Sequence, residues 1–322
     1  MKKCCILLIA VMSLALTACQ APDSTETIES ETETQSESTE TTKETEAIPP
    51  NTIDNMEKLI EVEDVISVTE ETFAYGMSIA VAYKVLFRSG DTQMAADFVL
   101  PADYGENGKN YPILIYFPEL PLTAYDLGVN FAQYDIIVVR LYARGYGESE
   151  GSRDLGGPND LADAKKLLQI CDEATFMKDA KMFVAGSSEG SITALRLLAE
   201  DTANRLSGCA IVDAITDLPA MGNARGEAVQ NLFASLIGKT YEGAPEAYDL
   251  RSAVKFHEKL NCPLLILHYT RNPLTPIEQA DNLYNLLKDT NKNCSYYKID
   301  VLTSDFSGEG LQRLLSWIKS HD

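Results

Sequence analysis

A glycine–serine turn is the most direct sign of chemistry in this sequence. Residues 184–191 read VAGSSEGS, so Ser188 lies between Gly186 and Gly190 in the spacing G-x-S-x-G. Glycines at these two positions let a strand and a helix approach closely while the serine takes a strained turn that exposes its hydroxyl. The chemistry indicated is nucleophilic attack by Ser188 on a carbonyl carbon, with the Glu189 backbone N–H as an oxyanion donor. The alternative is an ordinary turn in another α/β fold.

A nucleophilic serine needs a base, and this sequence offers few. Its three histidines are His257, His268 and His321. His268 ends an apolar run and is the histidine expected at the same edge of the sheet as Ser188. We therefore keep it as an alternative base, although a histidine at a strand end also has a purely structural explanation.

Most of the chain alternates between apolar runs and helical periods. The apolar runs predict strands buried on both faces at residues 112–117, 134–141, 181–185, 208–212, 263–268 and 296–301. The helical periods fall at residues 160–170, 190–200, 276–288 and 309–319. Alternation of this kind predicts an α/β fold with a mainly parallel central sheet and helices on both faces.

Three segments stand outside this alternation. Residues 80–100 hold two β-rich runs joined by Ser-Gly-Asp-Thr, which predicts an antiparallel hairpin. Residues 51–79 precede it as a partly helical lead-in to the main domain, residues 80–322. Residues 218–260 are too long for one crossover, and their helical stretch at 227–237 is expected to form a small cap. The cap would cover the carboxyl edge of the sheet, where ligands bind in open α/β folds.

The N-terminal end of the sequence looks like a bacterial lipoprotein signal. Residues 1–18 combine a basic start with an apolar run too short to span a membrane comfortably, and Leu-Thr-Ala leads into Cys19. The resemblance implies cleavage before Cys19 and a lipid anchor on its thiol, which would hold the protein on the extracytoplasmic face of the cell membrane. Residues 20–50, rich in Ser, Thr and Glu, are expected to form a disordered tether. An ordinary secretory signal is the alternative.

The composition excludes some partners. Asp and Glu number 48 against 27 Lys and Arg, a formal net charge of −21, which argues against nucleic acid. The glycines Gly145, Gly147 and Gly151 lack the spacing of a dinucleotide fingerprint. We therefore expect no cofactor, and as partners the membrane, through the lipid, and a small-molecule or peptide ligand.

The cysteines beyond the tether do not suggest a metal site. They are Cys171, Cys209, Cys262 and Cys294. None has the CxxC spacing of a metal ligand set, so no metal is expected. Cys262 and Cys294 each precede a predicted strand and could form a disulfide in an exported protein, with buried free thiols as the alternative.

Five segments, taken in order, carry a family resemblance. They are RSGDTQMAADFVLP from Arg88, RGYGESEG from Arg144, VAGSSEGS from Val184, YDLRSAVKFHEKLNCPLLILH from Tyr248 and PIEQADNLYNLLK from Pro276. Together they resemble the α/β-hydrolase superfamily, and most closely the catalytic domain of the prolyl oligopeptidase family (S9) and the related dienelactone-hydrolase-like esterases. The resemblance covers residues 80–319. It implies an α/β-hydrolase fold and serine hydrolysis of ester or peptide bonds, with substrate selection by the cap.

The resemblance also implies where the partners of Ser188 should lie. The family places an aspartate in the loop after the strand at 263–268, and this chain has Asn272 there. An asparagine accepts a hydrogen bond from an imidazole but cannot stabilise the imidazolium that forms when histidine takes the serine proton. The histidine should follow the last strand, and the position aligned with it is Ser304. Both triad positions are therefore predicted to be degenerate.

The second oxyanion donor also departs from the family pattern. After the strand that ends at Phe117 the family has His-Gly-Gly or similar, whereas this chain has Pro118 and Glu119. Proline has no backbone N–H, which leaves Glu119 as the other candidate donor beside Glu189. A glutamate side chain near the site would repel a developing oxyanion unless it points outward.

These departures predict a hydrolase fold in which hydrolysis is impaired. The first hypothesis is an exported, lipid-anchored serine-hydrolase-like protein that keeps the Ser188 turn and binds a ligand or partner. The alternative is a weakly active serine esterase or peptidase that uses Ser188 with an unusual base such as His268 or water. A purely structural surface module is a third interpretation.

Overall fold

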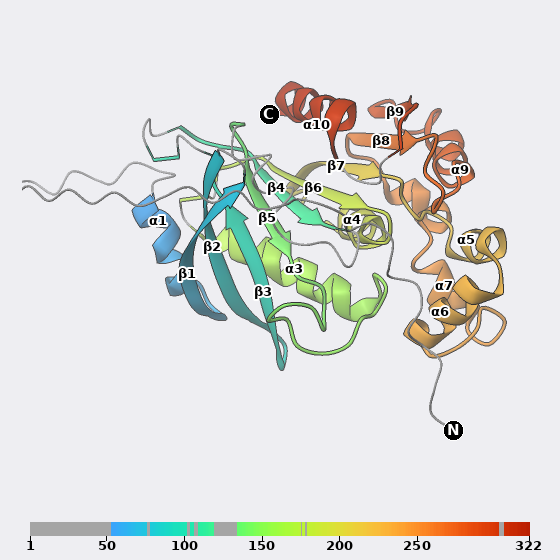
Figure 1. Ribbon diagram of the computed structural model, residues 1–322, viewed down its shortest axis with the longest axis horizontal. Coiled ribbons are helices and arrows are strands. Elements are labelled where there is room, and N and C mark those ends of the chain that lie inside the picture. The colour runs from blue at the N-terminus through green and yellow to red at the C-terminus, as the bar shows by residue number, and fades with distance from the viewer. Residues whose placement is uncertain are drawn as a thin grey trace, which may run out of the picture. The chain divides into compact units, whose positions relative to one another are not determined.

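A nine-stranded sheet in the order β1-β2-β3-β5-β4-β6-β7-β8-β9 forms the centre of the described part of the chain (Figure 1). This computed structural model describes residues 53–75, 78–101, 104–105, 109–118, 134–174, 176–177, 179–302 and 306–322, all within the unit Ala47–Asp322. The predicted signal, Cys19 and the tether lie outside the described residues.

Six strands form the parallel part of this sheet. They are β4 (Ile113–Phe117), β5 (Ile137–Leu141), β6 (Met182–Ser187), β7 (Leu206–Val212), β8 (Leu264–Tyr269) and β9 (Cys294–Ile299). Each pairs in parallel with its neighbour, from β5 through β4, β6, β7 and β8 to β9. Apolar runs form such strands because a sheet covered on both faces has no solvated side. The prediction of burial on both faces is wrong for β9, an edge strand in which only Ile299 is fully buried.

The predicted hairpin is confirmed. It consists of β2 (Ser78–Ser89) and β3 (Thr92–Val99), which pair antiparallel. The turn between them contains Gly90 with a φ of 60°, a left-handed conformation that glycine adopts without steric cost. β3 also pairs antiparallel with β5, so the hairpin extends the parallel sheet.

The lead-in contains a strand that the sequence analysis did not predict. In its described residues, 53–75 and 78–79, the helical parts are α1 (Ile53–Glu57) and a 3-10 helix (Lys58–Glu61), after which β1 (Val65–Tyr75) pairs along β2. β1 is an edge strand with glutamates in its middle, and Glu71 forms an ion pair with Lys84 of β2 at 3.0 Å. Charged residues protect an edge strand from further pairing. They also weaken the apolar signal by which a strand is predicted.

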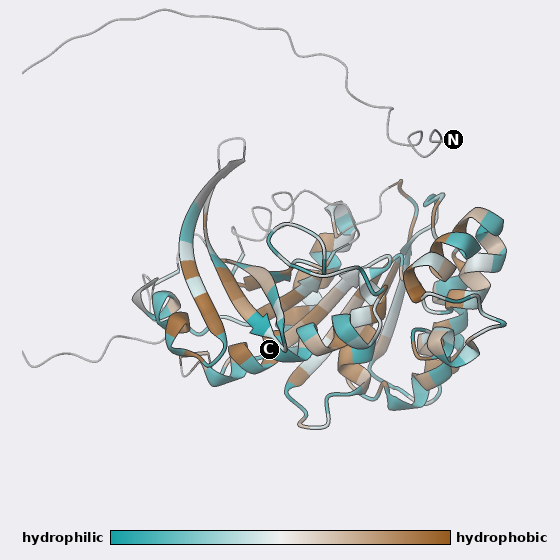
Figure 2. Cartoon of the chain, turned by 90° about the horizontal axis from the view of Figure 1, so that it is seen from below, coloured by the Kyte–Doolittle hydropathy of each residue, from teal (hydrophilic) through white to brown (hydrophobic). Residues whose placement is uncertain are grey.

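Helices cover both faces of the sheet. On one face, α3 (Pro158–Glu173), α4 (Gly190–Ala199) and α9 (Glu278–Leu287) bury apolar side chains in the larger core cluster. On the other face, α10 (Gly308–His321) packs a second cluster around Trp317. The central strands are mainly brown in Figure 2, in agreement with burial between two helical layers.

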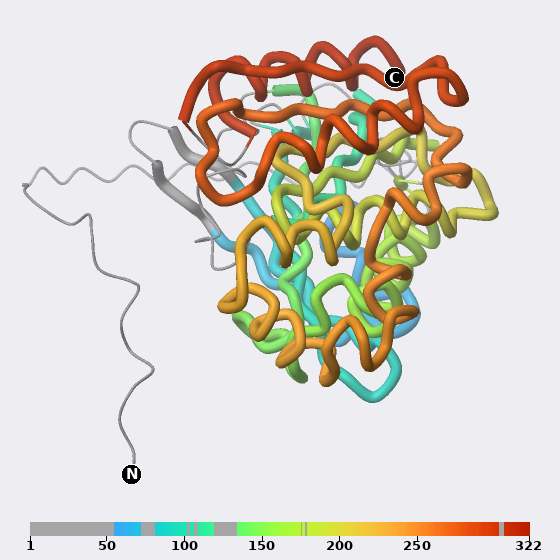
Figure 3. The backbone as a smooth tube through the Cα atoms, turned by 90° about the vertical axis from the view of Figure 1, so that its right-hand side faces the viewer, coloured from blue at the N-terminus to red at the C-terminus, as the bar shows by residue number. Residues whose placement is uncertain are grey.

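Between β7 and β8 the chain forms several short helices. They are α5 (Leu218–Arg225), α6 (Glu227–Ile237), α7 (Pro245–Asp249), α8 (Ala253–Phe256) and a 3-10 helix (His257–Lys259). α6 has the bounds predicted for the helical stretch of the cap. Figures 1 and 3 show α5, α6 and α7 in amber, away from the red C-terminal helix. A third apolar cluster, which includes Leu155, Ile192 and Phe233, joins these helices to α4.

The four described cysteines are free thiols. Cys171 and Cys209 are buried, whereas Cys262 and Cys294 are half-buried. Among the described residues no group of His, Cys, Asp and Glu has the arrangement of a metal site. The described helices include none that is both long enough and apolar enough to cross a membrane.

The packing of α9 generates a stability prediction. Leu283 is fully buried and Leu286, on the same helix, is 39% exposed. We expect Leu283→Ala to lower the free energy of unfolding by about 2–5 kcal/mol, because it leaves a cavity in the core. Leu286→Ala is the matched control and should change it by less than about 0.5 kcal/mol. Urea denaturation measures both values, and equal losses would contradict the assigned face of α9.

Candidate active site

Ser188 lies in a strained turn between β6 and α4. Its φ is 47°, a left-handed value that a residue with a side chain keeps only where the surrounding structure holds it. The Ser188 N–H donates to the Val212 carbonyl at 3.0 Å, and the Ser188 carbonyl accepts from the Ile215 N–H at 3.3 Å. The loop after the neighbouring strand β7 therefore holds the serine in this conformation.

The two glycines of the motif are required by close packing. A Cβ at Gly186 would lie 2.6 Å from the Ser191 Cα, and a Cβ at Gly190 would overlap the Phe117 carbonyl at the end of β4. No side chain larger than hydrogen fits at either position without a backbone shift. The spacing of the motif thus has the local explanation that the sequence suggested.

The Ser188 hydroxyl has no hydrogen-bonded base among the described residues. A general base must lie about 2.6–3.2 Å from the proton donor, or reach it through one water. The position aligned with the histidine, Ser304, lies outside the described residues, and so does Glu119.

None of the three histidines is hydrogen-bonded to Ser188. His257 contacts the Val254 carbonyl through Nδ1 at 3.0 Å, and His321 contacts the Trp317 carbonyl at 2.8 Å. His268, the alternative base, is 1% exposed in β8. Burial lowers the pKa of His268 to about 4, so this imidazole is neutral near pH 7.

Asn272, at the acid position, makes three hydrogen bonds through its side-chain amide. Its Oδ1 accepts from the N–H groups of Leu274 at 2.7 Å and Thr275 at 3.2 Å. Its Nδ2 donates to Asp213 Oδ2 at 2.6 Å. These contacts fix which side of the amide carries oxygen. The turn after β8 is therefore built around an amide at this position.

Asp213 is a site residue that the sequence analysis missed. It directly follows β7, has a φ of 47° and is fully buried. Its Oδ1 accepts from the Tyr269 N–H at 2.8 Å. The same oxygen lies 3.3 Å from His268 Nδ1, but this contact does not have the geometry of a hydrogen bond. The sequence did offer one signal for Asp213: an aspartate directly after the strand that pairs with β6, the strand before Ser188.

The charge of Glu189, next to the serine, is compensated. Arg153 Nη2 lies 2.5 Å from Glu189 Oε2. Glu189 is also the N-cap residue of α4, so its backbone N–H lies at the start of a helix, where the partial positive charge favours an anion. The guanidinium reduces the repulsion between the Glu189 carboxylate and a negative charge at this end of α4.

A small cavity of about 50 Å³ opens beside this helix start. Apolar side chains that include Phe117, Leu141 and Leu155 line much of it, together with Glu189 and Asp160. Burial raises the pKa of Asp160 to about 6. The cavity thus combines an apolar wall with a carboxyl group that can gain a proton in mildly acidic solution.

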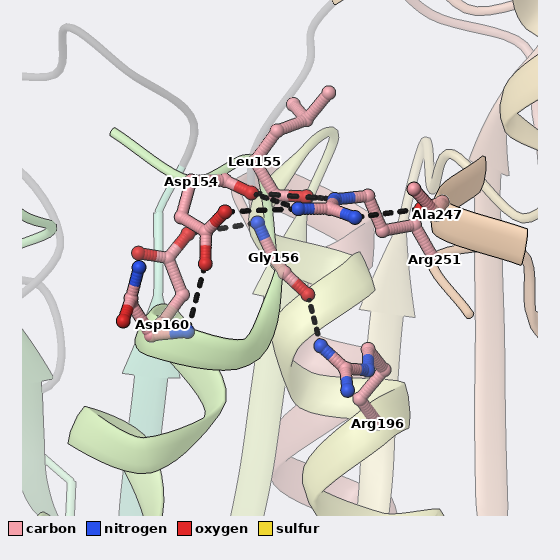
Figure 4. Close-up of polar contacts among 8 residues, drawn as sticks. Asp154, Leu155, Gly156, Asp160, Arg196, Ala247 and Arg251 are labelled. Carbon is pink, nitrogen blue, oxygen red and sulfur yellow. Dashed lines mark hydrogen bonds and ion pairs between the residues drawn. The ribbon is translucent and has the colours of Figure 1, made fainter. Parts of the chain in front are cut away.

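Two buried arginines fix the loop that forms one side of this cavity (Figure 4). Arg251, which follows α7, donates to the Leu155 carbonyl at 3.1 Å and to the Asp154 carboxylate at 2.9 Å. Arg196 of α4 donates to the Gly156 carbonyl at 2.6 Å. Burial lowers the pKa of both guanidinium groups, and the surrounding oxygens offset that desolvation. The cap and the helix after Ser188 are tied to the same loop.

Known proteins resemble this chain in sequence. The model of the prolyl oligopeptidase family matches residues 124–319. The chain is 21% identical over 196 residues to the uncharacterized peptidase YtmA of Bacillus subtilis (strain 168), over 60% of this chain and 75% of that protein. It is 21% identical over 271 residues to the uncharacterized peptidase YuxL of the same strain. That match covers 78% of this chain but only 41% of YuxL.

Solved structures share the fold at low sequence identity. The Pyrococcus furiosus esterase Pf2001 superposes with a TM-score of 0.56 at 13% identity, over 79% of this chain and 93% of that one. A puromycin-hydrolyzing peptidase of Mycobacterium tuberculosis gives a TM-score of 0.57 at 16% identity, over 80% and 47%. At such identities the likeness establishes the fold alone. It confirms the predicted α/β-hydrolase fold.

The buried imidazole of His268 generates a pH prediction. The pKa of His268 is about 4 in the folded protein, whereas an ordinary, solvated histidine has a pKa of 6.5. Between these values the unfolded chain binds a proton that the folded chain does not, so stability should fall as pH falls from about 6.5 to about 4. The contribution lost is on the order of 3 kcal/mol. This loss of stability should be absent from His268→Gln. The measurement is the difference in unfolding free energy between the wild type and the variant at each pH. A difference that does not change with pH would contradict the burial of a neutral imidazole.

Proposed function

Since this chain belongs to the prolyl oligopeptidase family of S9-like serine hydrolases, we propose that it is an exported, lipid-anchored member with impaired hydrolysis. Its role would be to bind a ligand or partner. The observation that carries the proposal is the Ser188 hydroxyl, which lies on a correctly built turn but has no hydrogen-bonded base among the described residues.

The chemistry of serine nucleophiles supports impairment. A serine hydroxyl stays protonated near neutral pH and needs an adjacent base to become reactive. Loss of the serine or histidine from a coupled triad costs a factor on the order of 10⁶ in kcat. None of the three histidines forms a hydrogen bond with Ser188: His257 and His321 bond to nearby carbonyls, and His268 Nδ1 faces Asp213. The aligned base position carries Ser304, which cannot replace an imidazole.

The cap supports a binding role. A cavity of about 330 Å³ lies among its helices. The buried aromatic side chains of Phe233 and Tyr248 line part of its wall, and the exposed polar side chains of Asn223 and Gln230 line another part. Small-molecule sites of similar volume usually combine apolar walls with a few hydrogen-bonding groups. Such a lining suits a small molecule or a peptide that presents both kinds of group.

The N-terminal sequence supports export and anchoring. The basic start, the short apolar run and the small residues before Cys19 fit a lipoprotein signal. A lipidated Cys19 would hold the domain at the membrane through two or more acyl chains. Residues 20–50 would then separate the folded unit from the bilayer.

A second candidate function is weak hydrolysis by Ser188. The strained turn and the helix start at Glu189 are both retained, and these are the features that expose a nucleophile and stabilise an oxyanion. An unusual base such as water or His268 would then have to accept the serine proton, and the buried His268 forms no hydrogen bond with Ser188.

A fluorophosphonate probe separates the two functions. We expect the mature protein to be labelled no faster than Ser188→Ala, because the probe reacts with activated serines. Labelling is followed by intact-mass spectrometry, with an active serine esterase as positive control. Stoichiometric labelling of the wild type that is lost in Ser188→Ala would sink the proposal of impairment and favour weak hydrolysis.

The lipid anchor has a separate test. In a bacterial host that processes lipoproteins, we expect the wild type to sediment with membranes and Cys19→Ser to be released, because the thiol is the attachment point. Fractionation followed by immunoblotting measures this. Cys262→Ser is the matched control and should sediment like the wild type. Release of both wild type and Cys19→Ser would contradict the anchor.

A further inference from the structure

The cavity of about 50 Å³ beside the start of α4 has a wall that is largely apolar. Met94, Phe117, Leu141 and Leu155 contribute to this wall, and all four side chains are buried. A water molecule needs about 10–15 Å³ of such volume. The cavity therefore has room for a short group of a few non-hydrogen atoms, and its wall favours an aliphatic one.

Asp160 contributes a carboxylate to the same wall and uses little of its hydrogen-bonding capacity. It is the third residue of α3, and its Oδ2 accepts the Gly156 N–H at 2.7 Å (Figure 4). Its Oδ1 is buried and has no hydrogen-bond partner. An ionised carboxylate offers about four lone-pair sites. Most of the acceptor sites of Asp160 are therefore unused.

The other acidic residues around the cavity each form an ion pair with an arginine. The pairs are Arg144 with Asp163 at 2.7 Å, Arg153 with Glu189 at 2.5 Å and Arg251 with Asp154 at 2.9 Å. Arg196, which contacts the same loop, pairs with Glu200 at 3.5 Å. Among the described residues Asp160 has no such partner. It leaves the surroundings of the cavity with one negative charge that no ion pair compensates.

This charge is costly where it lies. Burial raises the pKa of Asp160 to about 6, and the charges of Asp154 and Asp163 add to the rise. The Gly156 N–H and the Arg144 guanidinium act in the opposite direction. Asp160 is still mainly ionised near pH 7, without the ion pair that a buried charge requires. A cation in the cavity would supply it, and opposite charges attract more strongly in a poorly solvated site than in water.

We propose that this cavity binds a primary ammonium group on a short aliphatic stem, with Asp160 as the counter-ion. An ammonium group has three N–H donors for the unused acceptor sites of the carboxylate. The stem would lie along the apolar wall. A metal ion suits the site less well, because its ligands are oxygens and an apolar wall provides few. The described residues also contain no group of His, Cys, Asp and Glu arranged to hold a metal.

The inference deepens the proposed function, since it rests on the binding role and names a ligand class for it. It does not depend on whether Ser188 reacts. Loss of hydrolysis and recognition of a cation are separate properties of this end of α4, so each has its own measurement.

Binding of n-propylammonium to the full chain tests the site, with 1-propanol as the uncharged probe of similar size. Dissociation constants are measured by NMR titration of the amide signals of the protein. We expect the wild type to bind n-propylammonium about ten-fold or more tightly than 1-propanol, because a charged hydrogen bond is lost with the alcohol. Asp160→Asn should weaken n-propylammonium by a similar factor. Asp289→Asn, which removes an exposed acid, is the matched control and should bind like the wild type.

The pH dependence of binding is an independent readout. The pKa of Asp160 is about 6, so the affinity of the wild type for n-propylammonium should fall as the pH falls from about 7 to about 5. The amine itself stays protonated throughout this range. Asp160→Asn should bind weakly at every pH, because its amide does not titrate.

Three results would overturn the proposal: equal affinities for n-propylammonium and 1-propanol, an Asp160→Asn protein that binds the ammonium like Asp289→Asn, or no binding of n-propylammonium by the wild type. If Asp160→Asn does not fold, the comparison of the two probes and the pH profile of the wild type decide.

Ser188→Ala separates this inference from the proposal of impaired hydrolysis. It should bind n-propylammonium like the wild type, because Asp160 is unchanged. A wild type that reacts with the fluorophosphonate probe and binds the ammonium through Asp160 would end the proposal of impairment alone. An unreactive Ser188 together with no ammonium binding would end this inference alone.

Discussion

The backbone hydrogen bonds between the Ser188 turn and the loop after β7 are the constraint on which the site depends. They hold Ser188 at a φ of 47° and bring Asp213, in the same conformation, into the adjoining turn. The close approach of α4 to β4 then forbids a side chain at Gly190. Two neighbouring strand ends pack against the start of one helix at this edge of the sheet. This packing explains where Ser188 lies, why its backbone is strained and why position 190 is a glycine.

Buried charge links the cap to the same region. Arg251 from the cap and Arg196 from α4 both bind the loop at residues 154–156. Removing one partner of such a contact leaves a buried guanidinium or carbonyl without compensation, which costs more than the contact itself contributes. The loop should therefore be among the more firmly held surface segments.

The sequence predicted the features that depend on local patterns. The Ser188 turn follows from two glycines, and the parallel strands follow from apolar runs that a covered sheet requires. β1 was missed because its glutamates interrupt the apolar pattern at a sheet edge. Asp213 was missed because the feature that marks it, a hydrogen bond from Asn272, joins residues that lie 59 positions apart in the chain. The assignments of Glu119 and Ser304 stay predictions, since both lie outside the described residues.

In the part of the chain that the structure describes, the hydrolase fold keeps the nucleophile turn and a buried carboxylate, and no side chain forms a hydrogen bond with the Ser188 hydroxyl. The proposal to test is that Ser188 is correctly placed and not activated. The most direct measurement is stopped-flow turnover of p-nitrophenyl acetate at neutral pH, with the wild type compared with Ser188→Ala. If the serine is not activated, we expect equal rates and no burst in either protein. A stoichiometric burst of p-nitrophenol in the wild type that is absent from Ser188→Ala would contradict it.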